Sequence, residues 1–163
     1  MRTLWLVGMM GAGKSTVAPL VAARLGRIAI DIDRRVEEST GATVADLIAR
    51  DESAFRRAEA EAVRAIAGSD VVASCGGGVV LDDGLVADMR STGVVVWLDA
   101  PVEVLASRGI EDRPLLAGDA GALRRLSRAR DARYRAAAHA VVDADDTPDA
   151  VADRVVEAWS TSS

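Results

Sequence analysis

The strongest constraint on the fold is a glycine-rich loop between a strand-like run and an amphipathic helix. Residues 8–15 have the spacing Gly-x-x-x-x-Gly-Lys-[Ser/Thr], and Lys14 within them is the one lysine beside nineteen arginines. In such a loop the glycine N–H groups surround a phosphate, the lysine reaches the β- and γ-phosphates, and the hydroxyl binds Mg²⁺. Residues 3–7 before the loop are strand-like. The helix after it has an apolar stripe made of Val17, Leu20, Val21 and Leu25. This context predicts a phosphate site at a helix N-terminus.

Further strand-like runs alternate with segments of helical periodicity along the rest of the chain. They span residues 27–30, 70–74, 94–98 and 140–143. Such alternation predicts an α/β fold in which helices cover both faces of a parallel sheet. Because ligands of these sheets bind beyond the carboxyl ends of the strands, we expect the site in the loops that follow them. The 163 residues contain no linker-like segment, so we expect a single domain over 1–163.

Composition argues against several classes of partner. The net charge is −5 and the isoelectric point is about 4.9, which is unfavourable for nucleic-acid binding or for a membrane surface. No apolar run approaches the roughly 20 residues that a membrane-spanning helix needs. We therefore expect a cytoplasmic protein with no nucleic-acid or membrane partner. The single cysteine, Cys75, is expected to be a small buried residue.

Two carboxylates follow the second strand-like run. If the strand continued through residue 33, Asp31 and Asp33 would point to the same side. Carboxylates that face a triphosphate can hold Mg²⁺ through water and orient an acceptor hydroxyl. Asp33 has an alternative interpretation, as the cap of a helix over residues 34–39.

Two arginines are candidates for binding an anionic substrate. Arg56 precedes Glu59 by three residues on a predicted helix, which fits either an ordinary ion pair or a guanidinium fork that Glu59 braces. Arg130 falls in phase with the inward stripe that contains Leu126 and Tyr134. A charge directed inward needs a partner, and an anionic substrate would supply one.

Two glycine-containing segments complete the candidate site. Residues 76–78 are three consecutive glycines, which are costly to order but let a backbone approach a ligand closely. Ser74 just before them could help to hold the water shell of a metal ion. A polar loop over about residues 109–120 follows a predicted helix that ends near Arg108, and its length is typical of a mobile lid.

Taken in order, these motifs resemble the shikimate kinase family over nearly the whole chain. They are residues 8–15, Asp31-x-Asp33, Phe55-Arg56 with Glu59, Gly76-Gly77-Gly78, Arg113-Pro114-Leu115-Leu116, and Arg130 ahead of Tyr134-Arg135. The resemblance implies a P-loop nucleoside monophosphate kinase-like fold, with a five-stranded parallel sheet of order 2-3-1-4-5 flanked by helices. A lid and a substrate-binding segment at about 31–62 are also implied. The implied reaction is the ATP-dependent phosphorylation of the 3-hydroxyl of shikimate, which gives shikimate 3-phosphate and ADP in aromatic amino-acid biosynthesis.

The resemblance also implies a role for each candidate residue in a monomeric enzyme. The catalytic residues would be Lys14, Asp33 and Arg113, the last on the lid. The nucleotide would be bound by Gly11, Ala12, Gly13, Lys14, Ser15, Thr16, Arg108 and Arg113, with Arg108 against the adenine. Shikimate would be bound by Asp33, Arg56, Gly77, Gly78 and Arg130. Mg²⁺ would be bound by Ser15 and, through water, by Asp31.

Two alternatives stay open from the sequence. A P-loop kinase for another hydroxylated acceptor, such as a cyclitol or gluconate, would share the donor side of the site. A nucleotide-dependent switch protein would share the glycine loop, but it would have little use for Asp33, Arg56 and Arg130 as a set. A nucleotide acceptor is disfavoured because aromatic residues make up only 3% of the chain.

Overall fold

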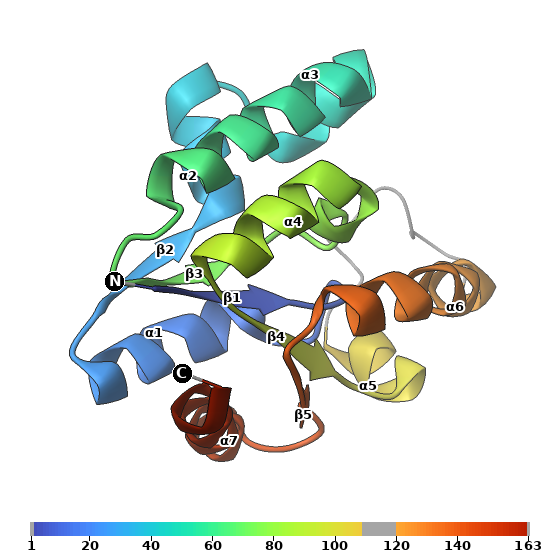
Figure 1. Ribbon diagram of the computed structural model, residues 1–163. Helices are drawn as coiled ribbons and strands as arrows, with labels where there is room; N and C mark the ends of the chain where they lie inside the picture. Colours follow the sequence, from blue (N-terminus) through green and yellow to red (C-terminus); the bar gives the residue numbers. More distant parts are fainter. Residues whose placement is uncertain (1, 109–119, 163) are drawn as a thin grey trace.

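The computed structural model describes residues 2–108 and 120–162, which form a five-stranded parallel sheet in the order β2-β3-β1-β4-β5 (Figure 1). The strands are β1 (Thr3–Val7), β2 (Ile28–Asp31), β3 (Val71–Ser74), β4 (Gly93–Asp99) and β5 (Ala140–Asp143). The helices are α1 (Lys14–Leu25), α2 (Ile32–Thr40), α3 (Val44–Ile66), α4 (Asp83–Thr92), α5 (Val102–Ser107), α6 (Ala120–Ala137) and α7 (Pro148–Ser162), with the short 3₁₀ helix η1 (Val79–Leu81). The predicted fold and strand order are confirmed.

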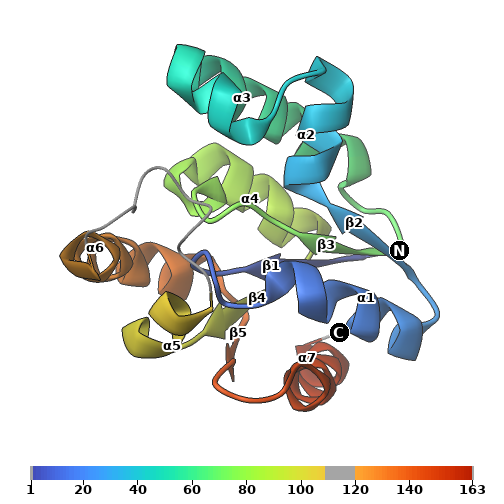
Figure 2. The same cartoon turned by 180° about the vertical axis from the view of Figure 1, so that it is seen from behind.

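The core of the sheet consists of β1 and its two neighbours. Every residue of β1 is buried, and it pairs in parallel with β3 on one side and β4 on the other. Continuous apolar runs of this kind belong to strands covered on both faces. Helices α1 and α7 pack together on one face, while α4 covers the other (Figures 1 and 2). The described residues contain no helix that is both long and apolar enough to span a membrane.

The start of α2 differs from the expectation. The strand does not continue through residue 33, because α2 begins at Ile32 and both Ile32 and Val36 are fully buried on its inner side. Asp31 is the N-cap, and its Oδ1 accepts a hydrogen bond from the N–H of Arg34 at 3.1 Å. The interpretation of Asp33 as a cap was therefore wrong. Its carboxylate lies in the first helical turn, where an acidic side chain interacts favourably with the helix dipole.

Helix α3 is interrupted where it passes the site. Asp51 has an extended backbone (φ −161°, ψ 99°), which separates the first turns of α3 from a regular segment that ends at Ile66. That second segment buries Phe55, Glu59 and Val63 on one side. The interruption allows the two parts of α3 to contribute different walls to the same cavity.

Candidate active site

Two cavities lie on either side of the glycine loop, next to the carboxyl ends of β1, β2 and β3. Their volumes are about 460 Å³ and about 430 Å³. Lys14 and Ser15 line both of them. We call the first the donor cavity and the second the acceptor cavity. An arrangement in which two cavities share one cationic side chain suits the transfer of a charged group from one bound molecule to another.

The glycine loop has a conformation that requires its glycines. Gly11 and Gly13 have positive φ angles of 83° and 90°, and a Cβ on Gly11 would lie 2.9 Å from the backbone oxygen of Leu105. Helix α1 starts directly after Gly13, so its first N–H groups face the donor cavity, which Gly11, Ala12, Gly13 and Thr16 also line. The amide groups and the dipole of a helix N-terminus form a favourable site for phosphate.

Lys14 is held within the loop that it belongs to. Its ammonium group donates hydrogen bonds to the backbone oxygens of Gly8 at 2.7 Å and Met9 at 2.9 Å, and the residue is only 8% exposed. Carbonyl groups stabilise the charge and direct the side chain toward the junction of the two cavities. The sequence pattern of the loop predicts a lysine that contacts phosphate, and the junction of the two cavities is a suitable position for it.

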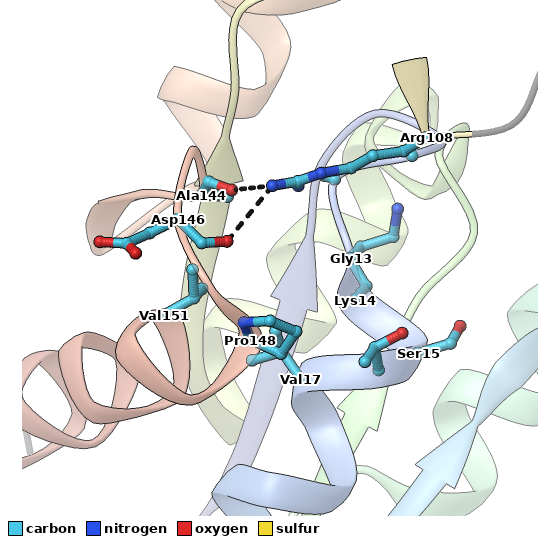
Figure 3. A pocket seen from close by; sticks show the side chains of 12 residues that line it. Gly13, Lys14, Ser15, Val17, Arg108, Ala144, Asp146, Pro148 and Val151 are labelled. Atoms are coloured by element: carbon cyan, nitrogen blue, oxygen red, sulfur yellow. Dashed lines mark hydrogen bonds between the residues drawn. The ribbon is translucent and has the colours of Figure 1, made fainter. Parts of the chain in front are cut away.

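Arg108, for which a place beside the nucleotide is predicted, extends across the donor cavity (Figure 3). Its Nη2 donates to the backbone oxygens of Ala144 at 2.9 Å and Asp146 at 3.4 Å in the loop after β5 (Figure 3). Pro148 and Val151, at the start of α7, form an apolar part of the wall. Val151 was missed from the sequence, because it carries no charged or nucleophilic group.

Three oxygen-bearing side chains meet at the junction of the cavities. The hydroxyl of Ser15 donates to Oδ2 of Asp31 at 2.7 Å and lies 3.3 Å from the hydroxyl of Ser74. The described residues contain no group of three or more His, Cys, Asp or Glu side chains that could enclose a metal ion. One carboxylate and hydroxyl oxygens, with open positions for water and phosphate, are a donor set that suits Mg²⁺.

The acceptor cavity contains both predicted arginines. Nη1 of Arg56 is 2.8 Å from Oε2 of Glu59, which is 1% exposed, and Nη2 is 3.5 Å from Oε1 of Glu52. The ion pair between Arg56 and Glu59 is therefore present, and both side chains also line the cavity. Arg130 lines it from α6, so the helix phase assigned to this residue is confirmed.

The three glycines after β3 pass unusually close to these charged side chains. A Cβ on Gly78 would overlap the guanidinium of Arg56, and a Cβ on Gly76 would lie 2.6 Å from Oε1 of Glu59 and 2.9 Å from Oδ1 of Asp33. None of the three glycines has a positive φ angle. They are therefore required for close approach rather than for an unusual backbone conformation.

The acceptor cavity also contains carboxylates that are poorly solvated. Burial is the main cause that raises the pKa of Asp33, and the charge of Asp31 adds to it while Lys14 opposes it. Burial likewise raises the pKa of Glu59, against the effect of its hydrogen bond with Arg56. Oδ1 of Asp33 and Oε1 of Glu59 are buried and have no hydrogen-bond partner among the described residues. Buried polar atoms without a partner are rare in folded proteins, so these two oxygens mark this part of the structure as a candidate functional site.

The structure thus brings together all but one of the predicted site residues. Lys14, Ser15, Asp31, Asp33 and the substrate-binding candidates line the acceptor cavity, and the glycine loop and Arg108 line the donor cavity. Arg113 and most of the lid predicted over about 109–120 lie outside the described residues.

Comparison with known proteins identifies the family. The family model for shikimate kinase matches residues 10–160. The chain is 48% identical over 148 residues to a shikimate kinase of Symbiobacterium thermophilum, an alignment that covers 86% of this chain and 85% of that protein. It superimposes with a TM-score of 0.91 and 32% identity on a shikimate kinase from Acinetobacter baumannii solved in complex with shikimate, covering 96% of this chain and 92% of that one.

A gluconokinase from Sinorhizobium meliloti shares the fold with a lower TM-score of 0.60 and 16% identity, covering 98% of this chain and 92% of that one. Similarity at that level shows a common architecture alone. The matches in sequence and in structure agree, and the chain belongs to the shikimate kinase family.

Proposed function

We propose that this protein transfers the γ-phosphoryl group of ATP to the 3-hydroxyl of shikimate. The observation that carries the proposal is the meeting of two cavities at Lys14, with Arg56 and Arg130 both in the cavity opposite the nucleotide loop. Shikimate is a ring acid with several hydroxyl groups, and the acceptor cavity offers two guanidinium groups together with buried carboxylate oxygens. The products would be shikimate 3-phosphate and ADP.

On the donor side, the loop from Gly11 to Thr16 would bind the phosphates through its N–H groups. Lys14 would interact with the transferred phosphoryl group because it is the cation that both cavities share. The planar guanidinium of Arg108 would lie against the adenine, and the apolar wall at Pro148 would contact the ring from another side. Phosphoryl transfer depends chiefly on positioning and on charge stabilisation, and these residues supply both.

Mg²⁺ would be held by Ser15 directly and by Asp31 through water. A bound Mg²⁺ neutralises the charge that develops on the phosphate oxygens during transfer. Ser74 would support its water shell, since its hydroxyl lies close to that of Ser15.

On the acceptor side, Arg56 and Arg130 would bind the carboxylate of shikimate, assisted by the backbone N–H groups of Gly77 and Gly78. Bidentate guanidinium contacts hold a carboxylate strongly and in a defined orientation. Asp33 would accept hydrogen bonds from the ring hydroxyls and would orient the attacking oxygen or take its proton. The position of Asp33 in the wall of the acceptor cavity supports this role.

Several parts of the assignment stay predictions. Arg113 would stabilise charge on the γ-phosphate from the lid at about 109–120, in a single kinase domain over 1–163 with a substrate-binding segment at about 31–62. A monomeric state, a cytoplasmic location and the absence of nucleic-acid or membrane partners also stay predictions.

The proposal is tested by measuring ADP formation with ATP and Mg²⁺ in the presence of candidate acceptors. We expect turnover that depends on shikimate and is much slower with gluconate or with a cyclitol that lacks a carboxylate. Turnover that does not depend on any acceptor would favour a nucleotide-dependent switch. Faster turnover with gluconate or a cyclitol would favour the alternative small-molecule kinase.

Gly78→Ala should weaken the binding of shikimate while leaving the protein folded. Gly78 has φ −97° and ψ 0°, a conformation open to alanine, so the expected effect arises from the displaced guanidinium of Arg56. Hydrogen bonds to charged groups contribute roughly 1.5–3 kcal/mol, so we expect the KM for shikimate to rise by about tenfold or more. The KM for ATP should stay unchanged.

Gly84→Ala is the matched control, because Gly84 is exposed on α4 and a Cβ there would meet only the side chain of Asp82, at 3.3 Å. Both kinetic constants should match those of the parent. An unchanged KM for shikimate in Gly78→Ala would show that Arg56 does not contact the acid.

A further inference from the structure

Tyr134 connects three segments that border the acceptor cavity. The residue is fully buried on α6, and its ring stacks on Trp97 with centroids 5.6 Å apart and planes at 21°. Its hydroxyl donates to the backbone oxygen of Gly77 and lies 3.7 Å from the sulfur of Met9 in the glycine loop. A single phenol group therefore links α6, the loop after β3 and the loop after β1.

Among Gly76, Gly77 and Gly78, the carbonyl of Gly77 is the one that accepts no hydrogen bond from η1, and Tyr134 donates to this carbonyl. The oxygen of Gly76 accepts from Val79 at 3.2 Å, and that of Gly78 accepts from Leu81 at 3.0 Å, both in the turn of η1. The oxygen of Gly77 accepts from Tyr134 instead. Burial raises the pKa of Tyr134 to about 12, so the hydroxyl remains protonated and remains a donor at neutral pH.

Holding this oxygen also sets the direction of a neighbouring donor. The peptide unit between Gly77 and Gly78 is planar and trans, so the N–H of Gly78 is antiparallel to the C=O of Gly77. The hydroxyl that holds the C=O therefore orients the N–H as well. Glycine has no side chain that could restrict the peptide plane, which makes an external hydrogen bond more important here.

The same helix carries one of the two acceptor arginines. Arg130 precedes Tyr134 by four residues, so both side chains leave α6 on the same face. A Cβ on Gly77 would lie 3.4 Å from Nη1 of Arg130. Two side chains of α6 therefore lie next to Gly77. The hydroxyl of Tyr134 donates a hydrogen bond to its carbonyl oxygen, and the guanidinium of Arg130 lies near its α-carbon.

We propose that Tyr134 is a positioning residue for the acceptor, which sets the backbone of Gly77 and Gly78 relative to Arg130 and so shapes the site for the substrate carboxylate. This inference rests on the proposed function for the identity of the acid. The effect of Tyr134 on the backbone of Gly77 and Gly78 does not depend on that function. Tyr134 acts through the loop and through α6 and does not touch the reacting atoms.

The test is Tyr134→Phe, which keeps the ring and its stacking on Trp97 and removes one oxygen. We expect the KM for shikimate to rise by about tenfold, while kcat and the KM for ATP stay within about twofold of the parent. A tenfold change corresponds to about 1.4 kcal/mol, within the range for a buried hydrogen bond whose partner is left unsatisfied. A structural role alone would lower stability without separating the two KM values.

Arg90→Ala is the matched control for a general loosening of α6. Nη1 of Arg90 donates to the backbone oxygens of Ala137 at 2.8 Å and Ala138 at 3.2 Å, at the end of the same helix and outside both cavities. We expect this variant to lower the melting temperature and to leave the KM for shikimate unchanged. An equal rise of that KM in both variants, or no rise in Tyr134→Phe, would overturn the proposal.

A second readout does not require any acceptor. Hydrogen exchange of the Val79 and Leu81 amides, measured on the protein alone, should become several-fold faster in Tyr134→Phe and should stay unchanged in Arg90→Ala. If shikimate supports no turnover even in the parent, the proposed function fails, and the exchange rates still decide whether Tyr134 orders the loop. Unchanged rates in Tyr134→Phe would overturn the positioning role in that case as well.

Discussion

Lys14→Met should lower the turnover of shikimate by about a thousandfold, which is the upper range for removing one group that stabilises a transition state electrostatically. Lys14 lines both cavities, so in the proposed reaction the phosphoryl group would pass its ammonium on the way from donor to acceptor. Methionine has a similar length and volume but no charge. The variant also loses the hydrogen bonds to Gly8 and Met9, so a thermal unfolding curve must accompany the kinetics.

Lys14→Arg separates charge from geometry. Lys14 is almost fully enclosed, and the planar fork of arginine does not reproduce a compact ammonium group. We expect turnover between that of the parent and that of Lys14→Met. Calorimetric titration with ADP would show how much of each loss arises from binding. Turnover of Lys14→Met within about tenfold of the parent would remove Lys14 from the catalytic residues.

Asp33→Asn should lower kcat by at least about a hundredfold, because a positioned acid or base contributes that much or more to a proton transfer. Asparagine has nearly the same shape, but its amide cannot take the proton of the attacking hydroxyl. Oδ1 of Asp33 has no hydrogen-bond partner among the described residues, so the substitution breaks no contact of that atom. We expect the KM for ATP to be little changed.

Asp46→Asn is the matched control for Asp33→Asn. Both aspartates lie in the first turn of a helix, so both substitutions remove a similar interaction with a helix dipole. Asp46 is exposed and lies outside both cavities. Its substitution should leave kcat unchanged. A rise of the KM for shikimate in Asp33→Asn with an unchanged kcat would make Asp33 a binding residue without a catalytic role.

The features that the sequence predicted well depend on neighbours along the chain. The glycine loop combines a positive φ at Gly11 and Gly13 with the start of a helix, and these are conditions that a short pattern of residue types can encode. The phase of Arg130 on α6 was predicted from an apolar stripe that repeats every three or four residues. Strand positions were predicted within one residue at each end, because continuous apolar runs are characteristic of a buried parallel sheet.

The start of α2 was predicted wrongly, because the local pattern fits two structures equally well. Residues around Asp31 fit either the end of a strand or the cap of a helix, since aspartate is favourable at an N-cap and alternation in a strand would also place Asp31 and Asp33 on one side. Burial of Ile32 and Val36 against the rest of the protein favours an early helix start. Both carboxylates still line the acceptor cavity, for a reason other than the one expected.

The chain alone thus specified the donor loop, the α/β architecture and the types of charged residue that the acceptor requires. Folding decided which of those residues meet. The hydroxyl of Tyr134 reaches a carbonyl 57 residues earlier, Arg108 reaches one 36 residues later, and Gly78 passes against Arg56. Contacts between such distant residues depend on how the helices pack on the sheet. Every residue has a peptide carbonyl, so the sequence does not indicate which carbonyl will accept a hydrogen bond. The physical reason is that side-chain pattern is local, whereas the backbone groups that complete this site become distinct only when distant segments are packed together.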